Sequence, residues 1–260
     1  MIMMVFWHYF QQKRGFRKIV ALYRFLHNLD KIHKYVQEAK KFKSLGGQIF
    51  KLDPFLEEKN QVAGSFHGHY FWQDIIVAQW VLKQNKAKLA DIGSRIDGYV
   101  SNVASSRQLV VIDIRPMNTQ IPNVEFIQRD VLSIQSKESF EIVTSLHTLE
   151  HIGLGRYGDQ IDPQGHTKAF STLANLVVKD GSLVVSFPIS SQTEVEFNGQ
   201  RKIGFKEPLK WAKSVGLDLI QFIHLDSKEQ IYYFFTVKEL DNFVPESGTL
   251  GIYFFKKVVN

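Results

Sequence analysis

Two aspartates in the first half of the chain have the type and spacing of residues that bind a nucleoside. Asp91 lies at the end of an apolar run, two residues before Gly93, and Asp113 ends a second apolar run 22 residues later. This interval is about the length of one strand–helix–strand unit, in which a glycine turn admits the ligand and the second carboxylate binds the ribose hydroxyls. The spacing therefore predicts a Rossmann-like nucleoside site.

The turn after Asp91 argues against a phosphate-rich ligand. It reads GSRIDG, from Gly93 to Gly98. This is not the G-x-G-x-x-G of dinucleotide sites, and the chain has no G-x-x-x-x-G-K-[ST] phosphate loop. We therefore expect a nucleoside ligand with little or no phosphate.

A dense group of acid–base residues follows a later predicted strand. His147, Glu150 and His151 lie in LHTLEHI, directly after the apolar run that ends at Leu146. In an open α/β sheet, the segment after the carboxyl end of a strand lines the ligand crevice. A histidine there is suited to accept the proton of an attacking hydroxyl. We expect His147 to lie nearest the reacting group, with Glu150 and His151 as the other catalytic candidates. The alternative is that Glu150 and His151 only hydrogen-bond the following loop.

The same histidines allow a metal-site interpretation. If the segment is helical, His147 and His151 share one face at i, i+4, and Asp159, Asp162 or His166 could add ligands. The order H-T-L-E-H differs, however, from the H-E-x-x-H of zinc proteases, because its glutamate is in another register. We therefore expect no metal site here.

The loop GLGRYGDQIDPQGH, which follows these histidines, is the expected acceptor-binding segment. Long loops in compact domains often bind ligands, and the upstream segment FHGHYFW could close over the same site. The predicted acceptor-binding residues are Arg156, Tyr157, Asp159, Asp162, His166 and His69. An ordinary turn-rich loop and a packed aromatic cluster are the alternatives for these two segments.

Alternating strands and helices are expected to position these residues. Apolar periodicity predicts strands at Lys88–Ile92, Leu109–Ile114, Val124–Gln128, Glu141–Leu146, Ser182–Phe187, Leu217–His224 and Leu250–Lys256. It predicts helices within Ser65–Asn85 and at Asp97–Ser105, Lys168–Val178 and Pro208–Val215. This alternation is typical of a Rossmann-like, doubly wound α/β fold with a mostly parallel sheet. We expect the last two strands to form an antiparallel pair at the edge.

Positive charge is concentrated near the N-terminus. Residues 1–51 hold eleven Lys/Arg against two acidic residues, a net charge of +9, whereas the remainder has a net charge of −3. Apolar positions in this stretch repeat with helical period. We therefore divide the chain into a basic amphipathic helical arm with its connection, residues 1–64, and a Rossmann-like domain, residues 65–260. The arm either packs on the domain or contacts an anionic membrane surface. No nucleic-acid motif is present, so we expect no nucleic-acid partner.

Composition limits the chemistry and the location. The chain has no cysteine, which excludes disulfides, thiolate metal sites and a cysteine nucleophile. No apolar run approaches the ~18–20 residues of a membrane-spanning helix, and Met1 to Phe10 lacks the flanks of a signal peptide. We expect a cytoplasmic protein, attached peripherally to the inner face of the membrane if the arm binds lipid. The sequence leaves a homo-oligomer open.

The order of these signals resembles that of the class I S-adenosylmethionine-dependent methyltransferases. Asp91 and Gly93 match the start of that family's D-x-G-x-G-x-G loop, Asp113 its ribose-binding acid, and Asp130 the residue near the adenine amino group. The resemblance implies S-adenosylmethionine as cofactor and S-adenosylhomocysteine as its product. The implied cofactor-binding residues are Asp91, Gly93, Ser94, Arg95, Asp97, Gly98, Asp113, Ile114, Asp130, Val131 and Leu146.

Arg95 and Asp97 depart from that family, because they occupy the positions of its second and third glycines. Glycine there permits close backbone approach or positive φ. The departure is compatible with a turn shaped by an Arg95–Asp97 pair, with an arginine that binds a carboxylate or phosphate, and with a pocket that no longer binds cofactor.

A more specific resemblance spans about residues 65–240. HYFWQDIIVAQW, DIGSRIDGYV, VIDIRP, LHTLEHIGLGRYGDQIDPQGH and EVEFNGQR together resemble an uncharacterised bacterial family associated with surface-polysaccharide biosynthesis. This resemblance implies the methyltransferase-like fold and no established reaction. Together with the site residues, the family association leads us to expect methyl transfer to a sugar hydroxyl in a nucleotide-sugar or a growing surface glycan. The alternatives are another nucleoside-using sugar transferase and a catalytically inactive scaffold that docks on a membrane-associated glycan assembly complex.

Overall fold

The computed structural model describes residues 29–53, 67–86, 88–135 and 139–258. Contacts divide the chain into two units, Met1–Ser65 and Phe66–Asn260. The first unit contains the helix α3 (Leu29–Ser44), on which Lys34, Lys40, Lys41 and Phe42 are exposed. Residues 1–28 and 54–64 of the predicted arm and its connection, and residues 65–66 of the predicted domain, lie outside the described residues.

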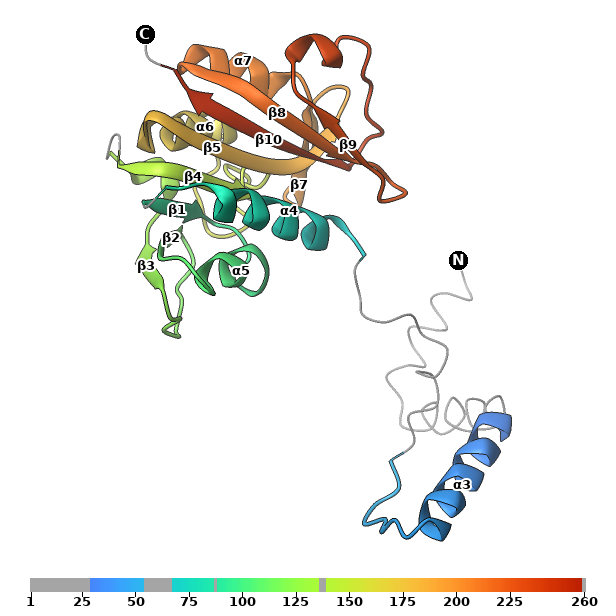
Figure 1. Cartoon of the computed structure of the whole chain (residues 1–260). Helices are drawn as coiled ribbons and strands as arrows, with labels where there is room; N and C mark the ends of the chain where they lie inside the picture. Colours follow the sequence, from blue (N-terminus) through green and yellow to red (C-terminus); the bar gives the residue numbers. More distant parts are fainter. Residues whose placement is uncertain (1–28, 54–66, 87, 136–138, 259–260) are drawn as a thin grey trace. The chain divides into compact units, whose positions relative to one another are not determined.

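The second unit is built on one mixed sheet with helices on both faces (Figure 1). Its strands are β1 (Leu89–Ile92), β2 (Leu109–Asp113), β3 (Val124–Gln128), β4 (Phe140–Leu146), β5 (Val177–Ser190), β6 (Glu194–Glu196), β7 (Gln200–Gly204), β8 (Leu217–Leu225), β9 (Ile231–Phe234) and β10 (Thr249–Lys257). They follow the order β3-β2-β1-β4-β5-β10-β8-β9, and β7 pairs with β5 and β6. The strands from β3 to β5 are parallel. β10 runs antiparallel to β5 and β8, and β9 runs antiparallel to β8.

Helices cover the two faces through separate apolar clusters. They are α4 (His69–Lys83), α5 (Ser101–Ala104), α6 (Gly165–Leu176) and α7 (Glu207–Ser214), with short π or 3-10 turns η2 (Ile96–Val100), η3 (Val131–Ser133) and η4 (Val237–Leu240). α4, η2 and α5 pack on one face through residues such as Val77 and Val103. α6 and α7 pack on the other through Phe170, Leu173 and Ala212. The chain therefore has the predicted doubly wound α/β fold (Figure 1).

Burial on both faces explains the continuous apolar runs of the central strands. β1 is buried throughout, and β4 is buried from Ile142 to Leu146. Asp91 of β1 is in register with Val111 of β2 and Thr144 of β4. The carboxyl ends of these three parallel strands therefore meet at one edge of the sheet, and so do the loops that follow them.

Several predicted elements change at their ends or position. All seven predicted strands are present, but β5 extends well beyond Ser182–Phe187 in both directions. The predicted helix Asp97–Ser105 is the π-helical turn η2 followed by the short α5. The last two predicted strands, β8 and β10, are antiparallel as expected, yet the edge strand is β9 and β10 lies inside the sheet. β9 was not among the predicted strands; it pairs with β8 after a tight turn in which Glu229 has a φ of +62°.

No helix in the described part of the chain is both long and apolar enough to cross a membrane.

Candidate active site

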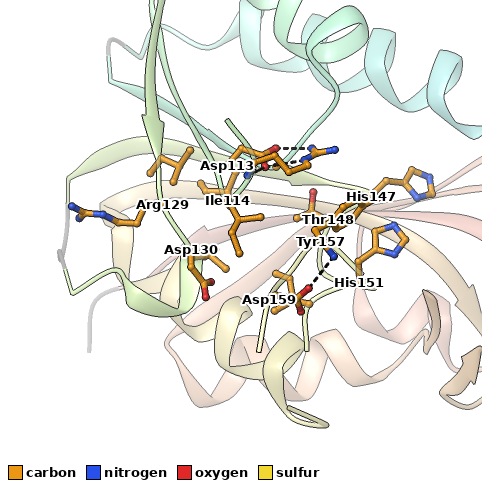
Figure 2. A pocket seen from close by; sticks show the side chains of 15 residues that line it. Asp113, Ile114, Arg129, Asp130, His147, Thr148, His151, Tyr157 and Asp159 are labelled. Atoms are coloured by element: carbon orange, nitrogen blue, oxygen red, sulfur yellow. Dashed lines mark hydrogen bonds and ion pairs between the residues drawn. The ribbon is translucent and has the colours of Figure 1, made fainter. Parts of the chain in front are cut away.

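A pocket of about 570 Å³, open to solvent at its mouth, lies at the carboxyl ends of β1, β2 and β4. Figure 2 shows Arg129 and Asp130 on the opposite side of the pocket from His147 and His151. The lining residues are Ile92, Gly93, Ile112, Asp113, Ile114, Arg115, Arg129, Asp130, Val131, His147, Thr148, His151, Ile152, Tyr157 and Asp159.

Gly93 makes the turn that opens the pocket after β1. Its φ is +73°, a backbone conformation that glycine adopts most readily. A Cβ at this position would lie 2.6 Å from Cγ2 of Thr148, in the loop after β4. Any side chain at residue 93 would therefore collide with the opposite wall.

Asp91 lies beneath this turn and does not line the pocket. Its buried carboxylate accepts hydrogen bonds from the Ser94 hydroxyl (2.5 Å), the Ser94 backbone N–H (3.1 Å) and the Thr144 hydroxyl (2.7 Å). The Leu146 N–H in turn donates to Ser94 Oγ at 3.0 Å. Asp91, Ser94 and Leu146 were all predicted to bind cofactor, but none of them lines the pocket. The side chains of Asp91 and Ser94 and the backbone N–H of Leu146 instead join the glycine turn to β4.

Arg95 and Asp97 form a bidentate ion pair with each other, at 3.0 and 2.7 Å. The Arg95 guanidinium also lies 4.7 Å from the centre of the Tyr70 ring, at the start of α4. Gly98 lets α4 approach, because a Cβ there would lie 1.9 Å from Oδ2 of Asp74. These three predicted cofactor-binding residues do not line the pocket. The missing glycines are thus replaced by a charged pair that shapes the turn.

The remaining predicted cofactor-binding residues do line the pocket: Gly93, Asp113, Ile114, Asp130 and Val131. Asp113 ends β2 and is bound by Arg115, a residue that the sequence analysis did not single out. Asp113 Oδ1 accepts from the Arg115 backbone N–H at 2.8 Å and from Nε at 3.0 Å, and Oδ2 accepts from Nη2 at 2.6 Å (Figure 2). Asp130 caps η3 by accepting from the Leu132 N–H at 2.9 Å.

His147 lies at the other end of the pocket and pairs with a buried glutamate. Its Nδ1 is 2.7 Å from Oε1 of Glu150, whose side chain is 0% exposed. The His147 ring centre is 4.6 Å from that of Tyr70 and 5.9 Å from that of His69. Its Nε2 is buried and has no hydrogen-bond partner among the described residues. The predicted catalytic residues His147 and Glu150 therefore form a dyad, although only His147 lines the pocket.

His151 lines the pocket beside His147, but the helix considered for this segment is absent. Residues 149–157 form turns, and His147 has a φ of +50°, which no helix allows. The shared i, i+4 helical face is therefore wrong. His151 Nδ1 is 2.8 Å from the Gly199 carbonyl, and Nε2 is 3.8 Å from Glu150 Oε1. Burial lowers the pKa of His151, with Glu150 acting in the opposite direction.

Asp159 and Tyr157 are the predicted acceptor-binding residues that line the pocket. Asp159 accepts from the backbone N–H groups of Gly153, Gly155 and Tyr157, which fixes the loop. The Tyr157 ring packs edge-on against His151, with ring centres 5.6 Å apart.

The other predicted acceptor-binding residues lie outside the pocket. Arg156 stays close to it, because its Cζ is 5.2 Å from the centre of the Tyr157 ring. Asp162 binds Lys168 at 2.6 Å at the start of α6. His166 is buried against Trp211, and burial lowers its pKa to about 4. These contacts indicate that Asp162 and His166 hold α6 in place.

His69 begins α4 and lies over the site without lining the pocket. Burial, followed by the nearby His147, lowers the pKa of His69 to about 4. Glu229 in the β8–β9 turn accepts from the Gly68 N–H at 2.8 Å, which fixes the start of α4. Two residues of the site, Tyr70 and Arg115, were not predicted from the sequence. Tyr70 belongs to the aromatic segment FHGHYFW, and Arg115 follows Asp113 by two residues.

Within the described ranges, no group of three or more histidine or carboxylate side chains is arranged to hold a metal ion.

Comparisons with known proteins identify the class of the fold that carries this site. The family described as "Caenorhabditis protein of unknown function, DUF268" matches residues 108–230. Comparison with curated protein sequences gives no match. Among solved structures, the chain is similar to the Burkholderia thailandensis 1,6-didemethyltoxoflavin-N1-methyltransferase, which was solved with 1,6-didemethyltoxoflavin and S-adenosylhomocysteine. The identity is 11% and the TM-score 0.52, covering 72% of this chain and 77% of that chain.

A second solved structure, the cyclase SpnF, is 12% identical with a TM-score of 0.55, covering 76% of this chain and 86% of that chain. The predicted fold class is confirmed, since the sheet is that of the class I methyltransferases. A methyltransferase and a cyclase share it, so the fold alone does not determine the reaction. The bacterial and surface-polysaccharide association stays a prediction.

Proposed function

We propose that the chain is an S-adenosylmethionine-dependent methyltransferase that acts on a hydroxyl group of a sugar or glycan. The observation that carries the proposal is the His147–Glu150 dyad, because His147 lines the pocket and its buried Nε2 has no hydrogen-bond partner in the described part of the chain. Such a site combines a binding pocket with a base for a high-pKa nucleophile.

The residues present fit the adenosine part of the cofactor. Gly93 lines the pocket without projecting a side chain into it, and the side chains of Ile112, Ile114 and Val131 supply apolar walls. Asp113 would hold the ribose hydroxyls and Asp130 the adenine amino group, as the resemblance implies. When bound, S-adenosylmethionine supplies an electrophilic methyl group on a sulfonium.

The dyad gives His147 the proton-accepting role. An ionised Glu150 only accepts hydrogen bonds, so the bond at 2.7 Å places the ring proton of His147 on Nδ1. Nε2 then carries a lone pair that can accept the proton of an acceptor hydroxyl. Glu150 stabilises the imidazolium that forms, because it is buried at hydrogen-bond distance.

The aromatic rings of Tyr70 and Tyr157, beside the dyad, support an acceptor that contains a ring. Tyr70 contacts His147 and Tyr157 contacts His151, and both tyrosines are partly exposed. Each carries an arginine over its ring, Arg95 on Tyr70 and Arg156 on Tyr157. Stacking faces with cationic donors nearby suit a sugar that bears hydroxyl or acidic groups. The glycan assignment itself comes from the family association.

The catalytically inactive scaffold is the second candidate. It is favoured by the Arg95–Asp97 pair in place of two glycines and by the occupied Asp113 carboxylate. In both versions we place the protein in the cytoplasm, as the absence of cysteine suggests, with the arm contacting an anionic membrane or a partner complex. A homo-oligomer stays part of the proposal.

Calorimetric titration with S-adenosylmethionine and S-adenosylhomocysteine tests the function, with NAD and a nucleotide-sugar as controls. Micromolar binding to the first pair alone supports the methyltransferase and leads to a screen of sugar acceptors. If folded protein binds neither compound, the catalytically inactive scaffold replaces the methyltransferase as the proposed function. Binding of a control alone redirects the assignment to that ligand.

A further inference from the structure

The Arg115 side chain binds the carboxylate of Asp113, which would bind the ribose hydroxyls under the proposed function. Its guanidinium binds both oxygens of Asp113, and its backbone N–H adds a third hydrogen bond. The Asp113 side chain is only 12% exposed, whereas that of Arg115 is 49% exposed. The outer partner of this pair is therefore the one that can move.

The acceptor capacity of Asp113 is nearly filled. An ionised carboxylate has about four lone-pair positions. Arg115 uses two on Oδ1 and one on Oδ2. The vicinal diol of a ribose donates two hydrogen bonds, one more than Asp113 can still accept. Ribose binding thus requires that the guanidinium give up at least one of its contacts.

The opposite side of Arg115 touches the acceptor side of the pocket. Its Cζ lies 4.8 Å from the centre of the Tyr157 ring. Tyr157 belongs to the loop after β4, packs on His151 and is followed by Asp159, which binds the Tyr157 N–H. Arg115 therefore bridges the end of β2 and the loop that carries the proposed acceptor residues, and Asp113, Arg115 and Tyr157 line one pocket.

We propose that Arg115 is a positioning residue that makes the acceptor site respond to the nucleoside. In the free protein, Arg115 neutralises Asp113 and holds Tyr157. A bound ribose displaces the guanidinium from Asp113, and Tyr157 moves with it, so that the nucleoside binds before the acceptor. This inference rests on the proposed function, because it assumes that Asp113 binds the ribose. Linkage requires the reverse effect as well: an acceptor that fixes the displaced loop tightens nucleoside binding.

Titration of S-adenosylhomocysteine into Arg115→Gln tests the competition. Removal of the competing guanidinium should tighten binding about two- to fivefold, the scale of a partly exposed ion pair. Arg115→Lys should give an intermediate affinity, since lysine keeps the charge and loses the fork. Arg129→Gln is the matched control, because it removes the same charge from the same pocket lining, whereas the contact of Arg129 with Asp113 is a backbone hydrogen bond that the variant keeps. It should not tighten binding.

Hydrogen–deuterium exchange of residues 153–162 tests the coupling to the loop. S-adenosylhomocysteine should change exchange in this segment of the wild type and have little effect in Arg115→Gln. Unchanged or weaker nucleoside binding by Arg115→Gln, with normal binding by the wild type, overturns the inference and leaves the proposed function standing. If no folded variant binds the nucleoside, the proposed function fails, and this inference with it. Binding by Arg115→Gln alone supports the inference.

Discussion

Glu150 Oε1 lies 2.7 Å from His147 Nδ1, and the carboxylate that makes this contact is fully buried. The backbone at His147 is left-handed, with a φ of +50°. Its ring contacts Glu150, which lies only three residues later in the chain. Such a backbone conformation is uncommon for a residue other than glycine and is often found at functional sites. Under the proposed function, this pair is the base of the site.

Replacement of His147 by alanine should abolish the proposed proton transfer while leaving nucleoside binding nearly intact. General bases contribute roughly 10²- to 10⁴-fold to rate, so we expect kcat to fall at least about 100-fold. Affinity for S-adenosylhomocysteine should change less than about threefold. The rate is measured on the acceptor that a screen provides. A His147→Ala enzyme with an unaltered kcat would remove His147 from the mechanism.

Glu150→Gln should disturb the tautomer of His147 without changing the shape of the site. Glutamine can donate as well as accept, so it no longer fixes the ring proton on Nδ1. Nitrogen NMR of the histidine ring measures this directly and needs no acceptor. We expect a single Nδ1–H tautomer in the wild type and a mixture in the variant. Identical spectra would show that Glu150 does not orient His147.

Asp113→Asn should weaken S-adenosylhomocysteine binding by roughly 10- to 100-fold, the scale of lost hydrogen bonds to a charged group. Asp97→Asn is the matched control, because Asp97 also pairs with an arginine two residues away but does not line the pocket. Calorimetry on both variants separates ribose recognition from a general loss of charge. Equal losses for the two variants would contradict the ribose assignment.

Gly93→Ala should destabilise the protein more than Gly158→Ala. Both glycines have positive φ, +73° and +85°. Only at Gly93 would the new methyl collide with Thr148, since nothing lies within 4 Å of a Cβ at Gly158. We expect about 1 kcal/mol of backbone strain at Gly158 and roughly 2–4 kcal/mol at Gly93. Urea unfolding measures both values, and similar values for both would refute the close contact.

Asp91 should make the folded state less stable as pH rises. Burial raises the pKa of Asp91 to about 7, although hydrogen bonds from Ser94 and Thr144 oppose it. Between pH 4 and pH 7, folded Asp91 holds a proton that the unfolded chain has released, so its contribution to stability falls by up to about 1.4 kcal/mol per pH unit. Asp91→Asn should remove this slope. Urea unfolding from pH 4 to pH 8 gives the difference between the two proteins, and parallel curves would contradict the raised pKa.

Other groups also titrate in this range, so only the difference between Asp91→Asn and the wild type tests the effect. Burial raises the pKa of Asp74 to about 6, which acts in the same direction. The pKa values of His69 and His166, lowered mainly by burial to about 4, act in the opposite direction between pH 4 and pH 6.5.

The full chain should bind vesicles of phosphatidylcholine with phosphatidylglycerol at low salt, if the arm contacts membranes. Lys34, Lys40 and Lys41 are exposed on α3. Each basic residue near an anionic surface contributes about 1 kcal/mol. Replacement of the three by glutamine should therefore weaken co-sedimentation at least about tenfold. Pure phosphatidylcholine is the control. Equal sedimentation with both lipids would exclude an electrostatic contact.

Local patterns in the sequence were sufficient to predict the sheet and one end of the site. The apolar runs that end at Asp91, Asp113 and Leu146 became β1, β2 and β4, because burial on both faces of a central strand leaves a continuous apolar signal. Parallel strands bring their carboxyl ends together, which explains why Gly93 and Asp113 line one pocket. Asp130, which only the resemblance to the methyltransferases implied, lines the same pocket.

Tertiary structure decided what each polar side chain contacts. Asp91 is buried beneath the turn and Asp113 lines the pocket, although each stands at the end of an apolar run in the sequence. Tyr70 reaches His147 from a helix far upstream, and the His147 that pairs with Glu150 has a left-handed backbone. Hydrophobic periodicity is a local property that determines which segments become strands and helices. The direction of a side chain beyond a strand end depends instead on loop torsions and on packing between segments distant in the chain, which the sequence pattern does not contain.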